Sequence, residues 1–136
     1  MSAPCTYDYA IVRVVPRVER GEFVNAGAIV CCRSVDFLAA RIELDDARLL
    51  ALDPAADLNA LRATLDAIPR VCAGGVAAGA LGTLGARARF DWLVAPRSSS
   101  VQVSPVHTGR CSDPAAALEH LIETMVRAPR RRAAAE

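Results

Sequence analysis

Three runs near the start of the chain have the apolar periodicity of β-strands. They span residues 7–15, 23–32 and 36–44, and Pro16 and Gly21 mark a turn between the first two. The three runs predict an antiparallel meander. Because the first two are apolar on both faces, we expect them to be central strands that are covered on both sides. The first strand is expected to present Asp8, Ala10, Val12 and Val14 on one face and Tyr7, Tyr9, Ile11 and Arg13 on the other.

Two later stretches have the 3.6-residue periodicity of amphipathic helices. Residues 53–68 predict a helix that begins at an Asp53 cap followed by proline. Residues 112–128 predict a second helix with the same arrangement at Asp113. Each helix has a single apolar stripe, so each is expected to pack on the sheet.

The segments around these helices are less regular. Residues 45–52 predict one short helix. Pro69 is expected to end the first main helix, and the Gly- and Ala-rich residues 69–85 predict a flexible loop that is a candidate lid. Residues 86–96 fit both a short helix and an extended segment.

Residues 100–110 predict a fourth strand, which Pro105 places at a sheet edge or a bulge. The elements together predict an α+β fold, with an antiparallel sheet of about four strands and two main amphipathic helices packed on it. Residues 1–126 are expected to form one domain, and residues 127–136 a basic, disordered tail.

Composition argues against a membrane-spanning protein and against a broad nucleic-acid surface. Every apolar run is broken well before the ~18 residues that a transmembrane helix needs. All 16 basic residues are arginine, and against 15 acidic residues they leave a net charge of only +1. Nucleic-acid contact is therefore expected only at the basic end of the chain, through Arg130, Arg131 and Arg132. The first residues lack a signal-peptide pattern, which predicts a cytoplasmic protein.

The cysteines do not suggest a metal or cofactor site. Cys31 and Cys32 are adjacent in a predicted strand, so they point to opposite faces and are not expected to share a metal ion or a disulfide. No C-x-x-C spacing occurs, and only two histidines are present. We expect small buried apolar side chains in a reducing compartment, with no redox role for the adjacent pair. The set comprises Cys5, Cys31, Cys32, Cys72 and Cys111.

Asn25 and Gly27 interrupt the second predicted strand where valine or isoleucine is expected. One interpretation is a β-bulge, or a glycine that lets a helix approach closely, with Asn25 bonded to backbone. The other is a shallow polar notch, lined by Asn25 and floored by Gly27, on the face that carries the two tyrosines and Arg13. The second interpretation predicts a binding site for a ligand or for a partner side chain.

Arg97 and Ser98 lie in the loop "APRSSS", whose chemistry suits an anion such as phosphate but is also ordinary for a turn. His107 follows on the fourth predicted strand, where a structural role is the more common one. Glu22 is a carboxylate without an obvious pair. No nucleophile, base and orienting group are arranged in a recognisable pattern, so no catalytic residue is assigned.

Two stretches of the chain together resemble a bacterial family known as domain of unknown function 3037. They are "YDYAIVRVVPRVERGEFVNAGAIVCC" and "RFDWLVAPRSSSVQVSPVHTG". The resemblance covers nearly the whole chain, and Ala26 stands where the family often has valine. It implies no activity. Because family members are often encoded beside a HipA-like kinase, it implies a small partner or regulator of such a kinase. The matching polar positions are Tyr7, Tyr9, Arg13, Arg20, Glu22, Asn25, Trp92, Arg97, Ser98 and His107.

These observations predict a non-enzymatic partner or regulatory protein, with a HipA-like kinase as its expected partner and a homodimer as a further expectation. Asn25, Arg97 and His107 are expected to line one polar patch if their strands are neighbours. The alternatives are a small anion- or nucleotide-handling enzyme or accessory that uses Arg97, Ser98 and His107, and a nucleic-acid contact through the tail. The predicted binding residues are Tyr7, Tyr9, Arg13, Glu22, Asn25, Arg97, Ser98 and His107.

Overall fold

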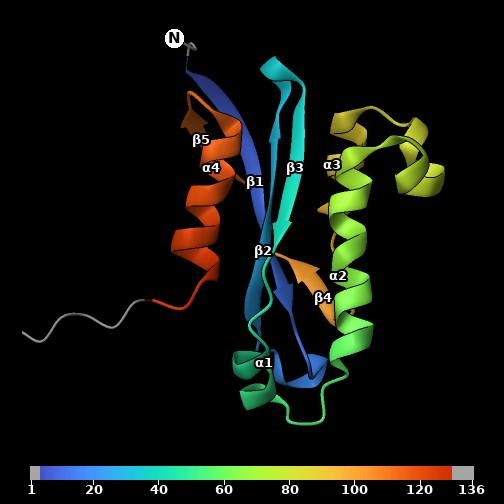
Figure 1. Cartoon of the computed structure of the whole chain (residues 1–136), viewed down its shortest axis with the longest axis vertical. Helices are drawn as coiled ribbons and strands as arrows, with labels where there is room; N and C mark the ends of the chain where they lie inside the picture. The colour runs from blue at the N-terminus through green and yellow to red at the C-terminus, as the bar shows by residue number, and fades with distance from the viewer. Residues whose placement is uncertain (1–3, 130–136) are drawn as a thin grey trace, which may run out of the picture.

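The computed structural model describes residues 4–129 and contains one antiparallel sheet of five strands (Figure 1). The order is β3-β2-β1-β4, and β5 also pairs with β1. The predicted α+β class and the meander are confirmed, but the predicted late strand is two strands separated by a bend. The strands are β1 (Cys5–Val14), β2 (Val24–Cys32), β3 (Phe37–Ile42), β4 (Val101–Val103) and β5 (His107–Cys111).

Ser104 makes the junction between the two late strands. β4 pairs with one end of β1 and β5 with the other. Between them the Ser104 N–H donates to the carbonyl of Ile11 at 2.8 Å, and the Ser104 hydroxyl accepts the N–H of Ile11 at 2.8 Å. The serine side chain thus replaces a ladder bond where the chain bends before Pro105.

The helices differ from the prediction mainly at the ends of α2. Asp57 caps this helix by accepting the N–H of Ala60, whereas Asp53, the predicted cap, ends α1. The helix also continues through Pro69 and ends at Gly74, whose φ of 73° leaves the helical region. The helices are α1 (Asp46–Leu52), α2 (Leu58–Ala73), α3 (Ala86–Leu93) and α4 (Pro114–Leu121), which continues as the π-helix η4 (Ile122–Val126).

The stretch predicted as a flexible loop is more regular than expected. Its first part completes α2, and its second part is the 3₁₀ segment η3 (Gly75–Thr83). There the backbone packs on itself, since a Cβ on Gly82 would lie 1.8 Å from the carbonyl oxygen of Gly75. The following segment, ambiguous in sequence, is the helix α3. Short 3₁₀ turns η1 (Val18–Arg20) and η2 (Arg33–Val35) complete the elements.

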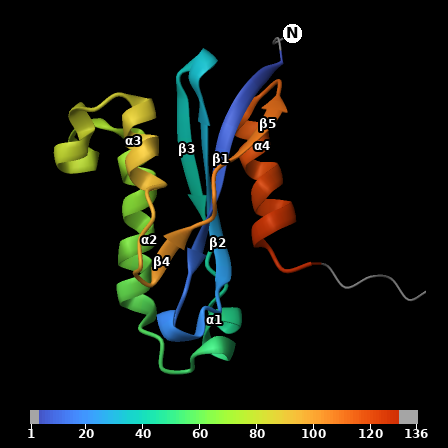
Figure 2. The same ribbon diagram turned by 180° about the vertical axis from the view of Figure 1, so that it is seen from behind.

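The helices cover both faces of the sheet, α2 and α3 on one side and α4 on the other (Figures 1 and 2). Two clusters of buried residues result, one on each face. Val12, Leu65 and Phe90 belong to the α2 side, and Ile11 and Ile122 to the α4 side. The prediction that β1 and β2 are covered twice is confirmed, because neighbouring residues of the same strand enter different clusters.

A β-bulge at Ala26 interrupts the alternation of β2. Val12 pairs with Gly27 and Arg13 pairs with Asn25, so Ala26 is the extra residue. The bulge shifts the alternation by one position, and Asn25 therefore faces α4 while Gly27 faces α2. The prediction of a bulge is confirmed, and the prediction that Asn25 and Gly27 share a face is wrong.

Gly27 allows a close approach, as expected, but the neighbour is β3 rather than a helix. A Cβ at this position would lie 2.4 Å from the carbonyl oxygen of Arg41 and 2.7 Å from Cδ1 of Ile42. These distances are shorter than any van der Waals contact, so only glycine fits against β3 here.

Ion pairs and hydrogen bonds hold the C-terminal helix against β3 and the segment that follows it. Arg41 pairs with Glu119, and Arg127 donates from Nε to Glu43 at 2.7 Å. Arg48 donates to the carbonyl of Val126 at 3.1 Å. Arg127, the first residue of the predicted tail, is held by this ion pair. The predicted contacts of Arg130, Arg131 and Arg132 lie outside the described residues.

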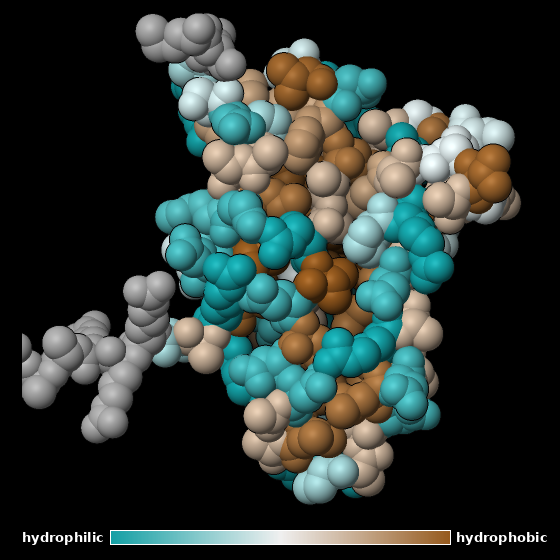
Figure 3. Space-filling view, viewed as in Figure 1, coloured by the Kyte–Doolittle hydropathy of each residue, from teal (hydrophilic) through white to brown (hydrophobic). Residues whose placement is uncertain are grey.

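The edge of β3 is apolar and open. Brown and tan residues run down the middle of this face between α4 and α2 (Figure 3). The expected homodimer would find a strand edge here, and it stays a prediction. None of the helices in residues 4–129 is long and apolar enough to cross a membrane.

Candidate functional site

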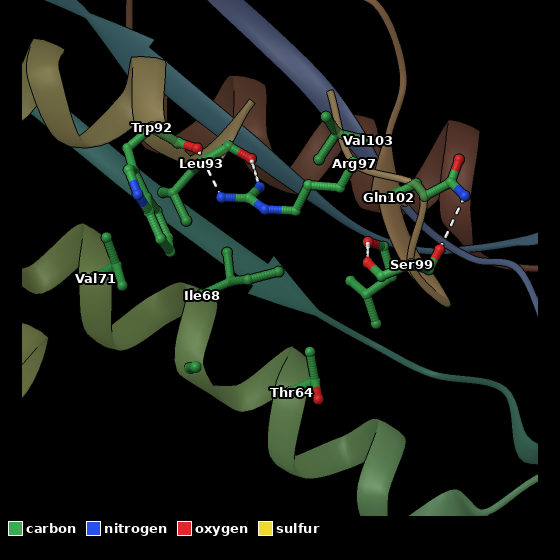
Figure 4. Close-up of a pocket in the computed structure, with 11 residues that line it drawn as sticks. Thr64, Ile68, Val71, Trp92, Leu93, Arg97, Ser99, Gln102 and Val103 are labelled. Carbon is green, nitrogen blue, oxygen red and sulfur yellow. Dashed lines mark hydrogen bonds between the residues drawn. The ribbon is translucent and has the colours of Figure 1, made fainter. Parts of the chain in front are cut away.

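An apolar pocket of about 180 Å³ lies between α2, α3 and β4 (Figure 4). Ile68 and Val71 from α2 and Leu93 from α3 form its walls together with the valines of β4. The apolar face of α2 is longer than the strand beside it, because α2 has 16 residues and β4 has only three. The helix therefore extends beyond the sheet that it covers and leaves a hollow beside Trp92, which is 47% exposed.

Arg97 closes one end of this pocket and is already bound. Its guanidinium lies 4.5 Å from the centre of the Trp92 ring. It donates to the carbonyl of Leu93 at 3.0 Å and to that of Trp92 at 2.9 Å (Figure 4). These are carbonyls of the last turn of α3, so Arg97 caps the helix. An anion bound by Arg97, as the sequence predicted, would have to displace these hydrogen bonds.

The serines beside Arg97 mostly stabilise their own turn. Ser99 donates to the carbonyl of Val101 at 2.9 Å, and the Gln102 side chain donates to the carbonyl of Ser99 at 2.8 Å. Ser98 is exposed on the loop. The arrangement is the ordinary turn that the sequence also allowed.

A second hollow of about 490 Å³ continues from the pocket along α2. Both are lined by Thr64, Ser99 and Val101, so they form one groove between α2 and the chain that leads into β4. Asp53 and Asp57 lie at the far end of the groove. The groove is thus apolar near Trp92 and acidic at its other end.

His107 and the two tyrosines lie on the opposite face of the sheet. The rings of Tyr7 and Tyr9 are 5.7 Å apart, and the rings of Tyr9 and His107 are 5.5 Å apart. Both tyrosines pack against the α4-side cluster, whereas Arg97 lines the groove beside α2. The sheet therefore separates Arg97 from His107.

Asn25 also faces α4, and its side chain fastens the π-helix. The amide nitrogen donates to the carbonyl of Met125 at 2.8 Å, which confirms the expected bond to backbone. Arg13, its partner in the ladder, lies 4.3 Å from the Phe23 ring. Among the described residues, Arg13 Nε and Asn25 Oδ1 are buried without a hydrogen-bond partner. These two unpaired polar atoms are the remaining support for the polar-notch hypothesis.

The predicted patch of Asn25, Arg97 and His107 is therefore not assembled. Asn25 and His107 share the α4 face, but they lie on strands on opposite sides of β1, opposite Arg13 and Tyr9, and Arg97 is on the other face. Glu22 lies apart from all three, exposed and paired with Arg20 at 2.5 Å. Two of the polar positions that match the family, Arg97 and Trp92, line the groove. Its other lining residues are mostly apolar, and the sequence patterns had assigned them only to the core.

A family model described as a protein of unknown function (DUF3037) matches residues 9–126. The chain belongs to this family. The match covers most of β1, from Tyr9 to Val14, and the groove residues from Asp53 to Val103. No curated protein and no solved structure matches the chain.

An ion-pair network in this DUF3037 chain was not foreseen in the sequence. Arg87 of α3 donates to Asp8 of β1 at 2.6 Å and lies 3.1 Å from Asp91. Thr108 donates to Asp8 at 2.9 Å. The hydrogen bond from Arg87 holds the pKa of Asp8 below its usual value, against the effect of burial. The network fixes α3, and thereby Trp92, on the sheet.

The pKa of Asp8 gives a testable pH dependence. A lowered folded-state pKa adds stability that is complete above the unfolded value of roughly 3.9 and is lost as the pH falls through the folded value. We expect Asp8→Asn to lower the unfolding free energy by roughly 1 kcal/mol at pH 7. Urea unfolding at pH 7 and pH 3 checks this. A difference between variant and wild type that is the same at both values would contradict it.

Proposed function

We propose that this DUF3037 protein is a non-enzymatic partner protein of the cytoplasm that binds an extended segment of another protein in the groove between α2 and β4. The observation behind the proposal is the apolar pocket beside the open edge of β4. A pocket that is mostly apolar and has few polar groups suits side-chain recognition rather than catalysis.

The hydrogen bonds to β1 define which backbone groups of β4 are available. The N–H of Val15 donates to Ser100 at 2.7 Å, and the N–H of Ser104 donates to Ile11 at 2.8 Å. In an antiparallel pair the groups that face the partner strand alternate, so those of Val101 and Val103 point away from β1, and of these the Val101 carbonyl already accepts one hydrogen bond from Ser99. An added strand would pair there and would place every second side chain towards the groove.

The groove also indicates the chemistry of the segment. Its apolar end has room for one large apolar side chain, whose burial is worth roughly 1.5–3 kcal/mol. At its other end Asp53 is paired with Arg17 at 3.7 Å, whereas Asp57 is exposed and has no ion pair among the described residues, so Asp57 favours a basic residue further along the same segment. We therefore infer an extended segment with an apolar anchor and a basic residue. A HipA-like kinase, which the family resemblance implies, is the first partner to test.

The test is the affinity of the purified chain for a HipA-like kinase from the same genome. Trp92→Ala is expected to weaken binding by roughly 30-fold, because a half-exposed tryptophan at a pocket mouth is typical of a binding hot spot worth roughly 2 kcal/mol. Isothermal titration calorimetry measures the dissociation constants.

Phe23→Ala is the matched control, since Phe23 is 44% exposed and lies away from the groove. This variant should bind like the wild type. Equal affinity of Trp92→Ala and wild type would reject the groove, and no binding by the wild type would reject the kinase as the partner.

A further inference from the structure

Three cysteine sulfurs meet where β1, β2 and β5 come together. Cys5 Sγ lies 3.2 Å from Cys32 Sγ and 3.5 Å from Cys111 Sγ, so Cys5 is the central member. Cys32 is fully buried, whereas Cys5 and Cys111 are partly exposed. The expectation of five buried apolar cysteines is thus wrong for these two. It holds for Cys31 and Cys72, which lie in the α2-side core.

We propose that Cys5 and Cys111 form a reversible disulfide that joins β1 to β5 when the protein meets hydrogen peroxide. This modification site is independent of the groove. In residues 4–129 no set of three His, Cys, Asp or Glu side chains is placed to hold a metal ion. Oxidation is therefore the chemistry that the cluster offers.

The strand register selects Cys111 rather than Cys32 as the partner of Cys5. Cys5 and Cys111 are directly opposite each other in an antiparallel pair. Opposite residues have Cα atoms about 4.5–5.5 Å apart, within the range of about 4.4–6.8 Å that a disulfide spans. Asp8 pairs with Cys31, so Cys32 is a diagonal neighbour of Cys5. Diagonal Cα atoms are about 7–8 Å apart, which is too far although the sulfurs touch.

Cys32 has a different role, as the buried hydrogen-bond partner of Cys5. Burial acts to raise the pKa of the Cys32 thiol, but hydrogen bonds from Ser34, Cys5 and the backbone N–H groups of Val35 and Ser34 outweigh it and lower the pKa. Hydrogen bonds to Cys32 and Cys111 raise the pKa of Cys5 to about 12. The Cys32 thiol also lies 3.4 Å from the carbonyl oxygen of Thr6, to which it donates.

The oxidation then proceeds in two balanced steps. The Cys111 thiolate attacks peroxide, an S–O bond forms, the O–O bond breaks and hydroxide leaves. Cys5 then attacks the Cys111 sulfur, so that the S–S bond forms, the S–O bond breaks, and the leaving hydroxide takes the Cys5 proton and departs as water. After proton exchange with solvent, two thiols and one peroxide have become one disulfide and two water molecules.

Two surface hollows give peroxide access to the cluster. One of about 430 Å³ and one of about 640 Å³ are both lined by Cys5, and the second also by Ser112, the neighbour of Cys111. Cys72 has no such access, because it is 5% exposed inside the α2-side core.

The test is a tryptic map of the full chain after treatment with hydrogen peroxide and alkylation of the remaining thiols. Cleavage after arginine separates residues 1–13, 21–33 and 111–127, which hold Cys5, the adjacent pair and Cys111. We expect mass spectrometry to find residues 1–13 linked to 111–127. The link should disappear after reduction, and Cys72 should stay free.

Cys111→Ser should abolish the link, while the matched Cys72→Ser should keep it. A link between residues 1–13 and 21–33 would overturn the register argument. Separate alkylation of Cys5 and Cys111 after peroxide would overturn the proposal itself. The wild-type map decides both points even if a serine variant folds poorly.

Discussion

Replacing Gly27 by alanine is expected to lower the unfolding free energy by about 3 kcal/mol, the upper end of the usual cost of overpacking. The new Cβ would lie 2.4 Å from the carbonyl oxygen of Arg41. That oxygen belongs to the backbone of β3, so relief requires β3 to move away from β2. Because Gly27 is buried beside the bulge at Ala26, the cost includes lost ladder bonds as well as the clash. Urea unfolding followed by circular dichroism measures the change.

Gly85→Ala is the matched control for this substitution. Gly85 has φ −65°, and a Cβ there meets nothing within 4 Å. Gly85 is the N-cap of α3, where alanine is less favourable than glycine, so the gain from restricting the unfolded chain is offset and the unfolding free energy is expected to change by less than about 0.5 kcal/mol. If Gly27→Ala were as stable as Gly85→Ala, the close approach of β3 would not be the reason for glycine in β2.

Phe90→Ala is expected to cost about 3–5 kcal/mol, because it removes a fully buried aromatic ring. Phe90 anchors α3 in the α2-side core, and the same helix carries Trp92 and Leu93 of the groove. The melting temperature is expected to fall by roughly 10 °C or more. Differential scanning calorimetry gives this value.

The comparison with Phe23→Ala separates burial from the loss of an aromatic ring. Phe23 is 44% exposed, so its removal is expected to cost under about 1 kcal/mol. Equal melting temperatures for Phe23→Ala and Phe90→Ala would contradict the anchoring role of Phe90. In that case the groove would need another support for α3.

Local patterns sufficed for the strands and for the C-terminal helix. The alternation of β1 and β2 predicted the central hairpin, and the Asp113 cap predicted the start of α4. The same reasoning chose Asp53 over Asp57 for α2, because both aspartates precede the apolar stripe and only the fold shows which one meets the first free N–H groups.

The site was less predictable, because it depends on which face each residue takes. A single extra residue at Ala26 moved Gly27 to the other face from Asn25, and no local signal distinguishes a bulge at Ala26 from one nearby. The separation of Arg97 from His107 followed from the bend at Ser104, which Pro105 suggested only in part. The thiol cluster depends on the pairing of β1 with β5, and only the three-dimensional register reveals that pairing.

The position of β1 in the sheet affects how the chain can fold while it is being synthesised. Among the described residues, the second edge of β1 pairs with β4 and β5. Cys111 of β5, which contacts Cys5 of β1, lies 106 positions later in the chain. During synthesis β1 therefore remains half paired until β4 and β5 have left the ribosome. Such distant pairing slows folding and exposes an edge to other chains. The nascent chain is thus most open to mispairing in the interval before β4 and β5 emerge.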